Sequence, residues 1–327
     1  MKSGKMSNVG CLYDPRNVMK RNETDLIHLD GNSALTQVSS LSDEEIRALL
    51  KKYKVHPTKK RGQSFLKSQQ VARNIVSAAG ITKEDIILEV GGGLGILTKQ
   101  LVQVGGHVHV IELDSGLVKA LHDTFVDCEN ITIIEGDALK VPLPNVTKVV
   151  SNLPYSISSE ITFRMLRELK FEQAILMYQK EFAQRLQAIP GTSEYSRLSV
   201  NIGYQAEIEH LIDVPADKFY PVPAVDSVVV RLKQSMRVPR AKSDDVFFWM
   251  INGIFPYPNK HLRKAMRIWF RNLKVDQNLV DVVLKHCKNC PKVDDRLRTI
   301  AIEKLVLLAD ALLILIEDGK LPDPRGN

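Results

Sequence analysis

The stretch that decides the fold runs from Asp85 to Thr98 and reads DIILEVGGGLGILT. An apolar run ends at Val90, glycines follow it, and a segment with helical spacing continues from Leu97 to Val104. Glycines at such a junction let the backbone pass close to a ligand, and the start of the helix offers free N–H groups. The stretch therefore predicts a strand, a ligand-binding loop and a helix.

Strand-like runs and helical segments alternate downstream of this loop. Segments such as Leu97 to Val104 and Leu117 to Phe125 have helical spacing. The strand-like runs are Asp85–Val90, His107–Leu113, Ile131–Gly136, Lys148–Leu153 and Gln173–Tyr178, and the β-branched run Ser227–Leu232 is expected to join the same sheet. This rhythm predicts parallel pairing with right-handed crossovers, so the fold class is a doubly wound α/β sheet.

The glycine loop does not match the common nucleotide-binding fingerprints. A dinucleotide site needs glycines at the first, third and sixth places, and starts at Gly91, Gly92 and Gly93 all fail this test. No Lys-Ser or Lys-Thr pair closes a phosphate loop, which argues against a nucleoside triphosphate site.

Polar side chains stand at the ends of the next strands. Glu112 follows the glycines by roughly 20 residues, where a carboxylate can accept hydrogen bonds from ribose hydroxyls. Asp137 follows the third strand and can accept a hydrogen bond from an adenine amino group. Asn152 to Tyr155 follow the fourth strand. An Asp at a strand end, and Asn and Pro in such a stretch, also occur in ordinary turns. A ribose-bearing cofactor without pyrophosphate fits the series, which indicates S-adenosylmethionine in a methyltransferase sheet.

Seven blocks together resemble the small-subunit ribosomal RNA adenine N6,N6-dimethyltransferases. In order, they are Gly62–Leu66, Glu89–Thr98, Glu112–Asp114, Gly136–Ala138, Asn152–Tyr155, Gln179–Arg185 and Phe219–Ser227. The resemblance covers about Pro57 to the C-terminus. It implies a Rossmann-like S-adenosylmethionine-dependent methyltransferase domain with a small C-terminal helical domain. The implied substrate is two adjacent adenosines in the hairpin near the 3′ end of small-subunit rRNA, modified during ribosome biogenesis.

The same resemblance implies roles for individual residues. The implied cofactor contacts are Ser64, Leu66, Gly91, Gly93, Glu112, Asp137 and Asn152, and the implied catalytic residues are Asn152, Leu153, Pro154, Tyr155 and Phe219. Ser64 stands where the family usually has Asn or His, and Gly92 where the loop often has Pro. Phe219 is implied to stack on the opposite side of the adenine from Tyr155, so that the two rings enclose an extruded base.

The composition favours a polyanionic partner. The chain has 327 residues, 44% of them hydrophobic and 25% charged, which is typical of a water-soluble globular protein of about two domains. A formal charge of +7 and a pI near 9.1 make nucleic acid the first candidate. The apolar run Leu305–Ile316 carries Asp310 and is too short to span a membrane, so we expect a buried helix. No signal peptide is visible, and we expect a cytoplasmic monomer without membrane association.

The cysteines give little support for disulfides or metal. Cys11, Cys128, Cys287 and Cys290 are too few and too scattered for a disulfide framework, which fits a reducing cytosol. Cys287 and Cys290 have the spacing of half a zinc site, but no second pair accompanies them. We therefore expect no bound metal.

Three regions are predicted along the chain: a disordered or loosely attached extension over 1–40, the methyltransferase domain over 41–235, and a helical RNA-binding domain over 236–327. In the last, Leu262, Met266, Trp269 and Leu273 share one helical face, and Arg263, Arg267, Arg271 and Lys274 share another. Such a basic face can be merely solvated, but with the overall charge it makes Arg263, Lys264, Arg267 and Arg271 the candidate RNA-binding residues.

Two other functions are compatible with these residues. A DNA adenine methyltransferase shares the acceptor chemistry of Asn152, and a non-catalytic ribosome-assembly or transcription factor could keep the fold for nucleic-acid binding alone. Cytosine-C5 chemistry requires a nucleophilic cysteine, usually after proline, and none of the four cysteines follows one.

Overall fold

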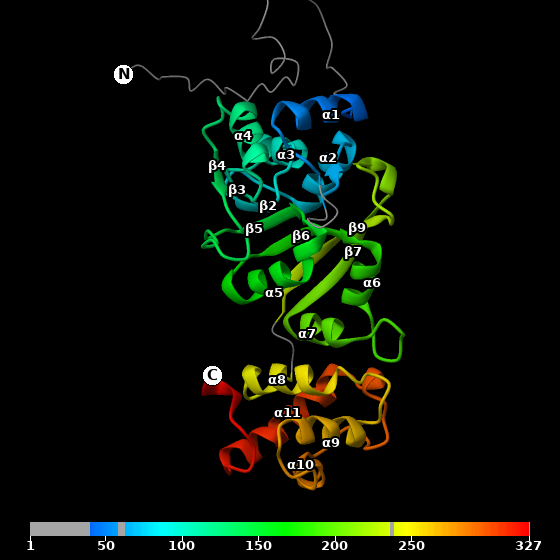
Figure 1. Cartoon of the computed structure of the whole chain (residues 1–327). Helices are drawn as coiled ribbons and strands as arrows, with labels where there is room; N and C mark the ends of the chain where they lie inside the picture. The colour runs from blue at the N-terminus through cyan, green and yellow to red at the C-terminus, as the bar shows by residue number, and fades with distance from the viewer. Residues whose placement is uncertain (1–39, 58–62, 236–238, 327) are drawn as a thin grey trace, which may run out of the picture. The chain divides into compact units, whose positions relative to one another are not determined.

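The computed structural model describes residues 40–57, 63–235 and 239–326 (Figure 1). Its internal contacts divide the chain into two compact units: the first holds residues up to Lys180 together with His210–Leu232, and the second holds Glu181–Glu209 and the residues from Lys233 onward. The predicted extension lies outside the described residues, apart from Ser40, and so do Lys59, Lys60, Arg61 and Gly62.

The division differs from the predicted boundary at residue 235. Residues 181–209 group with the C-terminal helices and include α7 (Arg197–Gln205) and nearly all of α6 (Lys180–Gln187). The physical reason is packing, because Tyr195, Val200 and Tyr204 are buried in the hydrophobic core of the second unit.

The central sheet is mostly parallel, as predicted. In spatial order its seven strands are β4 (Ile131–Glu135), β3 (His107–Glu112), β2 (Ile86–Val90), β5 (Lys148–Asn152), β6 (Gln173–Gln179), β9 (Ser227–Gln234) and β7 (Ala206–Val214). The first five pair in parallel, and β9 runs antiparallel to β6. Each of the six strands predicted from the sequence is present, with ends shifted by at most two residues.

Helices cover both faces of this sheet, with α2 (Gln69–Ala79), α3 (Ile96–Val104) and α4 (Ser115–Thr124) on one face and α5 (Ser158–Glu168) on the other (Figure 1). The first described helix is α1 (Asp43–Lys52), where Ser42 and Glu45 form a capping box. Asp114 caps α4 by accepting the N–H groups of Gly116 and Leu117.

A second, two-stranded sheet joins distant parts of the first unit. β1 (Phe65–Leu66) pairs antiparallel with β8 (Phe219–Tyr220), so that Phe65 faces Tyr220 and Leu66 faces Phe219. Two blocks separated by more than 150 residues in the sequence therefore form one element of structure.

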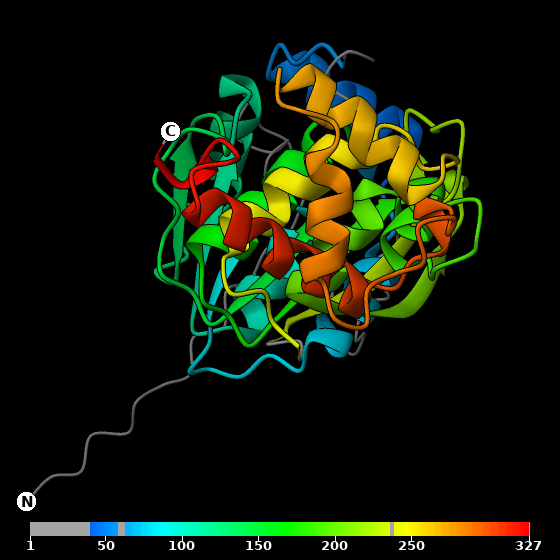
Figure 2. The same ribbon diagram turned by 90° about the horizontal axis from the view of Figure 1, so that it is seen from below.

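The second unit is helical. Besides α6 and α7 it contains α8 (Asp244–Ile254), α9 (Leu262–Asn272), α10 (Leu279–His286) and α11 (Ile302–Glu317), and Figure 2 shows α11 beside α8 and α10. The predicted apolar run lies in α11 and is buried. Asp310 in that run accepts the backbone N–H of Lys242. None of the helices in the described ranges is long and apolar enough to cross a bilayer.

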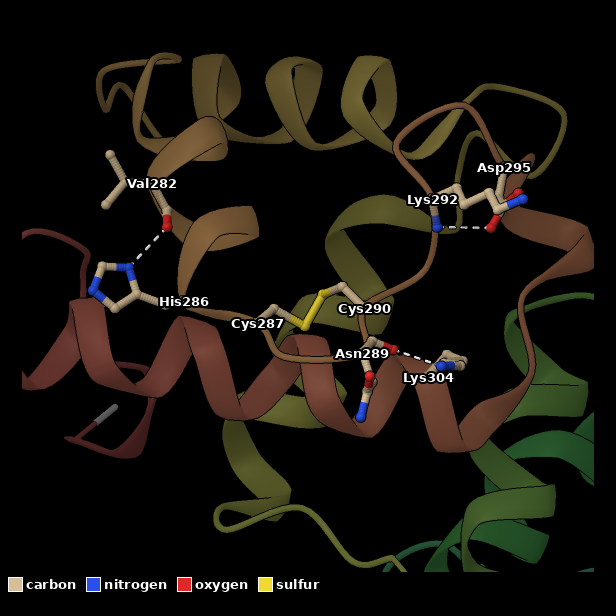
Figure 3. The surroundings of a disulfide bond; sticks show 8 residues. All are labelled: Val282, His286, Cys287, Asn289, Cys290, Lys292, Asp295 and Lys304. Atoms are coloured by element: carbon tan, nitrogen blue, oxygen red, sulfur yellow. Dashed lines mark hydrogen bonds between the residues drawn. A yellow bond between two sulfur atoms is a disulfide. The ribbon is translucent and has the colours of Figure 1, made fainter.

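Cys287 and Cys290 form a disulfide at the end of α10 (Figure 3). We did not predict this bridge from the sequence. The two cysteines follow the end of α10, and they can form a disulfide because their Cα atoms lie only 5.3 Å apart. Around it, Lys304 Nζ of α11 donates to the Asn289 carbonyl at 2.6 Å. Among the described residues, no group of three or more His, Cys, Asp or Glu side chains could hold a metal ion.

Candidate active site

The candidate site lies where the strand order reverses, between β2 and β5. The backbones of these strands pair at Ile87 with Lys148 and at Leu88 with Val149. The pairing does not continue toward their carboxyl ends. There the buried Ser151 hydroxyl takes over, donating to the Val90 carbonyl at 2.6 Å and accepting the Val90 N–H at 3.3 Å. The two strands therefore separate at their carboxyl ends without leaving these backbone groups unpaired.

A cleft opens at this point. Its walls come from the glycine loop and from the ends of β3, β4 and β5, and β1 adds a further wall. Among its lining residues are Ser64, Phe65, Leu66, Glu89, Gly91, Gly93, Glu112, Leu113, Asp137, Asn152, Leu153, Pro154 and Tyr155. Every predicted cofactor residue lies in this cleft, and so does every predicted catalytic residue except Phe219.

The glycine loop packs directly against the turn after β5. Gly91 has φ 82°, and a Cβ placed on it would lie 3.0 Å from Cγ of Pro154. Gly93 has φ 56° and gives its N–H to the Glu112 carboxylate at 3.0 Å. Both positions thus suit glycine, and any larger residue at 91 would push the loop away from the turn.

Glu112 is held as a hydrogen-bond acceptor. Its Oε1 accepts the N–H groups of Leu113 and Asp114 at 2.9 and 3.0 Å, and its Oε2 accepts that of Gly93. Burial raises the pKa of this carboxyl, and the three N–H donors act in the opposite direction. With Oε2 keeping a lone pair, the side chain can accept bonds from ribose hydroxyls.

Asp137 stands at the next strand end. Its Oδ1 accepts the Leu139 N–H at 2.9 Å, and Lys140 Nζ lies 3.6 Å from Oδ2. Leu113, which is 56% exposed, also lines the cleft and offers an apolar surface for a ring. The sequence prediction missed Leu113, although a large apolar residue directly after Glu112 was a usable signal.

Glu89 is a second cleft residue that the prediction missed. It is 1% exposed, its Oε2 has no hydrogen-bond partner, and burial, to which Glu112 adds, raises its pKa to about 8. The carboxyl is therefore mostly protonated at neutral pH. A buried acid with one unpartnered oxygen on the wall of a cleft can bind a polar group of a ligand. Its signal in the sequence was an acid inside the apolar strand that precedes the glycines.

The turn Asn152–Tyr155 lies beside the glycine loop. The side chain of the half-buried Asn152 has no hydrogen-bond partner among the residues that the structure describes, so its oxygen remains available as an acceptor. Leu153 is buried, and Pro154 contacts the Gly91 position. Tyr155 lines the cleft, and its hydroxyl is 2.7 Å from the Ser227 Oγ. Burial raises the pKa of Tyr155, so the phenol stays neutral.

Phe219 is placed differently from the other predicted residues. Its side chain is completely buried in the core of the first unit and is not on the cleft wall. Through its strand pairing with Leu66 it supports a residue that is on that wall. A direct stacking contact of Phe219 with a base remains a prediction, and it requires the side chain to leave the core.

A second site candidate is a basic groove in the second unit. It is lined by Asn259, Lys260, His261, Arg263, Lys264, Arg267, Ile268, Arg271, Gln277, Asp294 and Arg296. The four predicted RNA-binding residues are thus brought together on α9. Asp281 of α10 lies 3.3 Å from Arg263 and 3.2 Å from Arg267. The start of α9 is held by the N–H bonds of Leu262 and Arg263 to the carbonyls of Asp295 and Val293.

The fold and the cleft define a Rossmann-like, S-adenosylmethionine-dependent methyltransferase. The residues of the cleft fit this cofactor: Glu112 would accept hydrogen bonds from its ribose hydroxyls, Asp137 and Leu113 would hold its adenine, the glycines would allow close approach, and the unpartnered Glu89 oxygen would face a polar group. When bound, S-adenosylmethionine supplies an electrophilic sulfonium methyl group.

The comparison with known proteins narrows this class. The profile of the ribosomal RNA adenine dimethylases matches residues 56–292. The chain belongs to this family and is therefore an S-adenosylmethionine-dependent rRNA adenine dimethyltransferase.

Similar proteins are found among curated sequences and solved structures. A probable ribosomal RNA small subunit methyltransferase A of Methanococcus maripaludis is 41% identical over 234 residues, 71% of this chain and 87% of that protein. Its counterpart in Methanosarcina mazei is 43% identical over 224 residues, 68% of this chain and 81% of that protein. A crystal structure of a Plasmodium falciparum dimethyladenosine transferase, 27% identical, aligns with a TM-score of 0.65 over 79% of this chain and 99% of that one. The 23S rRNA methyltransferase ErmE, 25% identical, aligns with a TM-score of 0.55 over 76% and 99%.

Proposed function

We propose that this enzyme dimethylates N6 of two adjacent adenosines in the 3′-terminal hairpin of small-subunit rRNA, in the cytoplasm, during ribosome biogenesis. The observation that carries the proposal is the unpartnered Asn152 side chain in the lining of a cleft that also contains Glu112 and Asp137. The small-subunit target is supported by two relatives more than 40% identical to this chain, both of them probable ribosomal RNA small subunit methyltransferases A.

The turn Asn152–Pro154, called the acceptor turn below, has the hydrogen-bond acceptors that methylation of adenine N6 requires. An adenine amino group is a poor nucleophile because its lone pair is delocalised into the ring. The Asn152 side-chain oxygen and the Leu153 carbonyl would each accept one amino hydrogen, which draws the nitrogen toward tetrahedral geometry and directs its lone pair to the methyl group. After one methylation an N–H remains, so the same acceptors can hold N6-methyladenine for a second transfer. Asparagine suits this role because it accepts without needing to ionise.

Tyr155 would hold the base from one side. Its ring lines the cleft next to the acceptor turn, and a nucleotide extruded from its stack regains part of the lost stacking on such a ring. Pro154 would keep the turn rigid against the glycine loop, since it contacts the Gly91 position.

The basic groove of α9 would bind the RNA backbone. Six lysines and arginines line it (Lys260, Arg263, Lys264, Arg267, Arg271 and Arg296), against one acid, Asp294. Asp281 already pairs with Arg263 and Arg267, whereas Lys264 and Arg271 are exposed and form no ion pair with any described residue. We therefore assign the larger phosphate contribution to Lys264 and Arg271.

The test is transfer of labelled methyl groups from S-adenosylmethionine to four substrates: unmethylated small subunits, naked small-subunit RNA, large-subunit RNA and duplex DNA. We expect up to four methyl groups per small subunit or small-subunit RNA, and none on the other two. Preferential labelling of duplex DNA would establish a DNA adenine methyltransferase. RNA binding without transfer would establish a non-catalytic assembly factor. The Asn152→Ala variant, which should bind RNA normally, is the matched control.

A further inference from the structure

The hydroxyl of Tyr155 has a partner far away in the sequence. It lies 2.7 Å from the Oγ of Ser227, the first residue of β9, which has no solvent exposure. Stacking on a base requires only the aromatic ring, so the role proposed above for Tyr155 leaves this hydrogen bond unexplained. Phenylalanine would supply the same stacking face.

Ser227 is itself held in place from several directions. It pairs with Gln179 in the antiparallel ladder of β9 and β6. The preceding residue, Asp226, accepts the backbone N–H of Lys180 through its carbonyl and that of Ala216 through its side chain, both at 2.9 Å. The Ser227 hydroxyl is thus a rigid anchor, and a ring bonded to it loses the freedom to rotate away from the cleft.

The Phe219–Ser227 block is therefore connected to the cleft through Ser227 and not through Phe219. Phe219 is buried away from the cleft wall, whereas Ser227, at the other end of the block, bonds directly to a residue on that wall. Because Tyr155 begins the 3₁₀ turn Tyr155–Ile157, directly after the acceptor turn, fixing its ring also restrains the backbone next to Asn152.

We propose that Ser227 is a positioning residue for methyl transfer: its hydroxyl orients the Tyr155 ring so that the stacked adenine presents N6 to Asn152 and the Leu153 carbonyl. The inference rests on the proposed function, in that Tyr155 is the residue on which the base stacks. Ser227 touches neither the base nor the cofactor and acts only through Tyr155.

The experiment is a double-mutant cycle with Ser227→Ala and Tyr155→Phe in the full-length enzyme, with turnover measured at saturating S-adenosylmethionine on small-subunit RNA. Each single variant is expected to lower kcat by about tenfold or more, since small displacements of a reacting group have effects of this size. The double variant should be no slower than either single one, because both remove the same hydrogen bond. The Kd for S-adenosylmethionine should stay within about twofold, and Ser227→Thr, which keeps the hydroxyl, should restore most of kcat.

Tyr178→Phe is the matched control. Tyr178 forms the same kind of bond, 2.6 Å from its hydroxyl to the Thr162 Oγ, in the same unit but outside the lining of the cleft. The Tyr178→Phe variant should keep kcat within about twofold of the wild type, even if its melting temperature falls as much as that of the Ser227→Ala variant. An equal loss of kcat in Tyr178→Phe would show that Ser227 acts only through general stability.

Tyr155→Ala separates the two proposals. If Tyr155→Ala leaves both kcat and the KM for RNA unchanged, the stacking role itself is wrong. If Tyr155→Ala impairs transfer while Tyr155→Phe and Ser227→Ala retain full kcat, stacking stands and the positioning role of Ser227 is overturned. Additive losses in the double variant would also overturn it.

Discussion

Replacing Glu89 by Gln should change how the stability of the first unit depends on pH. The pKa of Glu89 is raised from an ordinary 4.5 to about 8 by burial. Between these values the folded state holds a proton that the unfolded state has lost. This contribution to stability is therefore fully present below about pH 4.5 and is lost as the pH rises toward 8.

The size of the effect follows from the two pKa values. Each pH unit within this window lowers the free energy of unfolding by about 1.4 kcal/mol, and the slope flattens near pH 8, so Glu89 accounts for a loss of about 2 kcal/mol between pH 6 and pH 8. Glu89→Gln cannot titrate, so that part of the pH dependence should disappear.

Hydrogen exchange of the amides of β2 is the suitable assay, because it reports on the unit that contains Glu89. Both tryptophans, Trp249 and Trp269, belong to the second unit, so fluorescence would follow the wrong part of the chain. The free energy of opening is measured at several pH values for the wild type, for Glu89→Gln, and for Glu135→Gln, which removes an exposed carboxylate from β4. Parallel pH profiles for the wild type and Glu89→Gln would show that the Glu89 carboxyl does not titrate with a raised pKa.

Three further predictions concern cofactor, acceptor and RNA. Asn152→Ala should lower kcat by about a hundredfold or more, while the Kd for S-adenosylmethionine rises only modestly. A rise in this Kd as large as the fall in kcat would indicate that Asn152 acts in cofactor binding alone. Glu112→Gln should raise the Kd for S-adenosylmethionine by about ten- to a hundredfold in equilibrium binding, because an amide nitrogen cannot accept the Gly93 N–H. An unchanged Kd would contradict the contact of Glu112 with the ribose. Lys264→Glu with Arg271→Glu should weaken RNA binding and flatten its salt dependence more than Arg263→Glu with Arg267→Glu, since Asp281 already pairs with the latter two. The reverse order in filter-binding titrations would show that the paired arginines are the phosphate contacts.

The sequence predicted the sheet because its strands are apolar runs bounded by polar or glycine residues. Parallel strands bring their carboxyl ends to one edge, so Glu112, Asp137 and Asn152 could be placed in one site from strand order alone. The structure brings these three residues together in a single cleft.

Features that depend on pairing between distant segments could not be predicted in this way. The strands β1 and β8 have only two residues each, too few to show any periodicity, and their pairing joins positions 65 and 220. Phe219 was placed by resemblance, and its burial could not be seen in the sequence. The grouping of α6 and α7 with the C-terminal helices depends on which core receives Tyr195 and Tyr204. The basic face of α9 was predicted from its period, but its pairing with Asp281 requires the position of α10.

The identity of the methylated nucleosides tests the proposed adenine N6 dimethylation most directly. Small subunits that lack the modification are incubated with S-adenosylmethionine and either the wild type or Asn152→Ala, and the RNA is digested and examined by mass spectrometry. We expect N6,N6-dimethyladenosine at two adjacent positions of the 3′-terminal hairpin with the wild type, and almost none with Asn152→Ala. Methylation at a ring nitrogen, or equal yields of dimethyladenosine from both enzymes, would contradict the proposal.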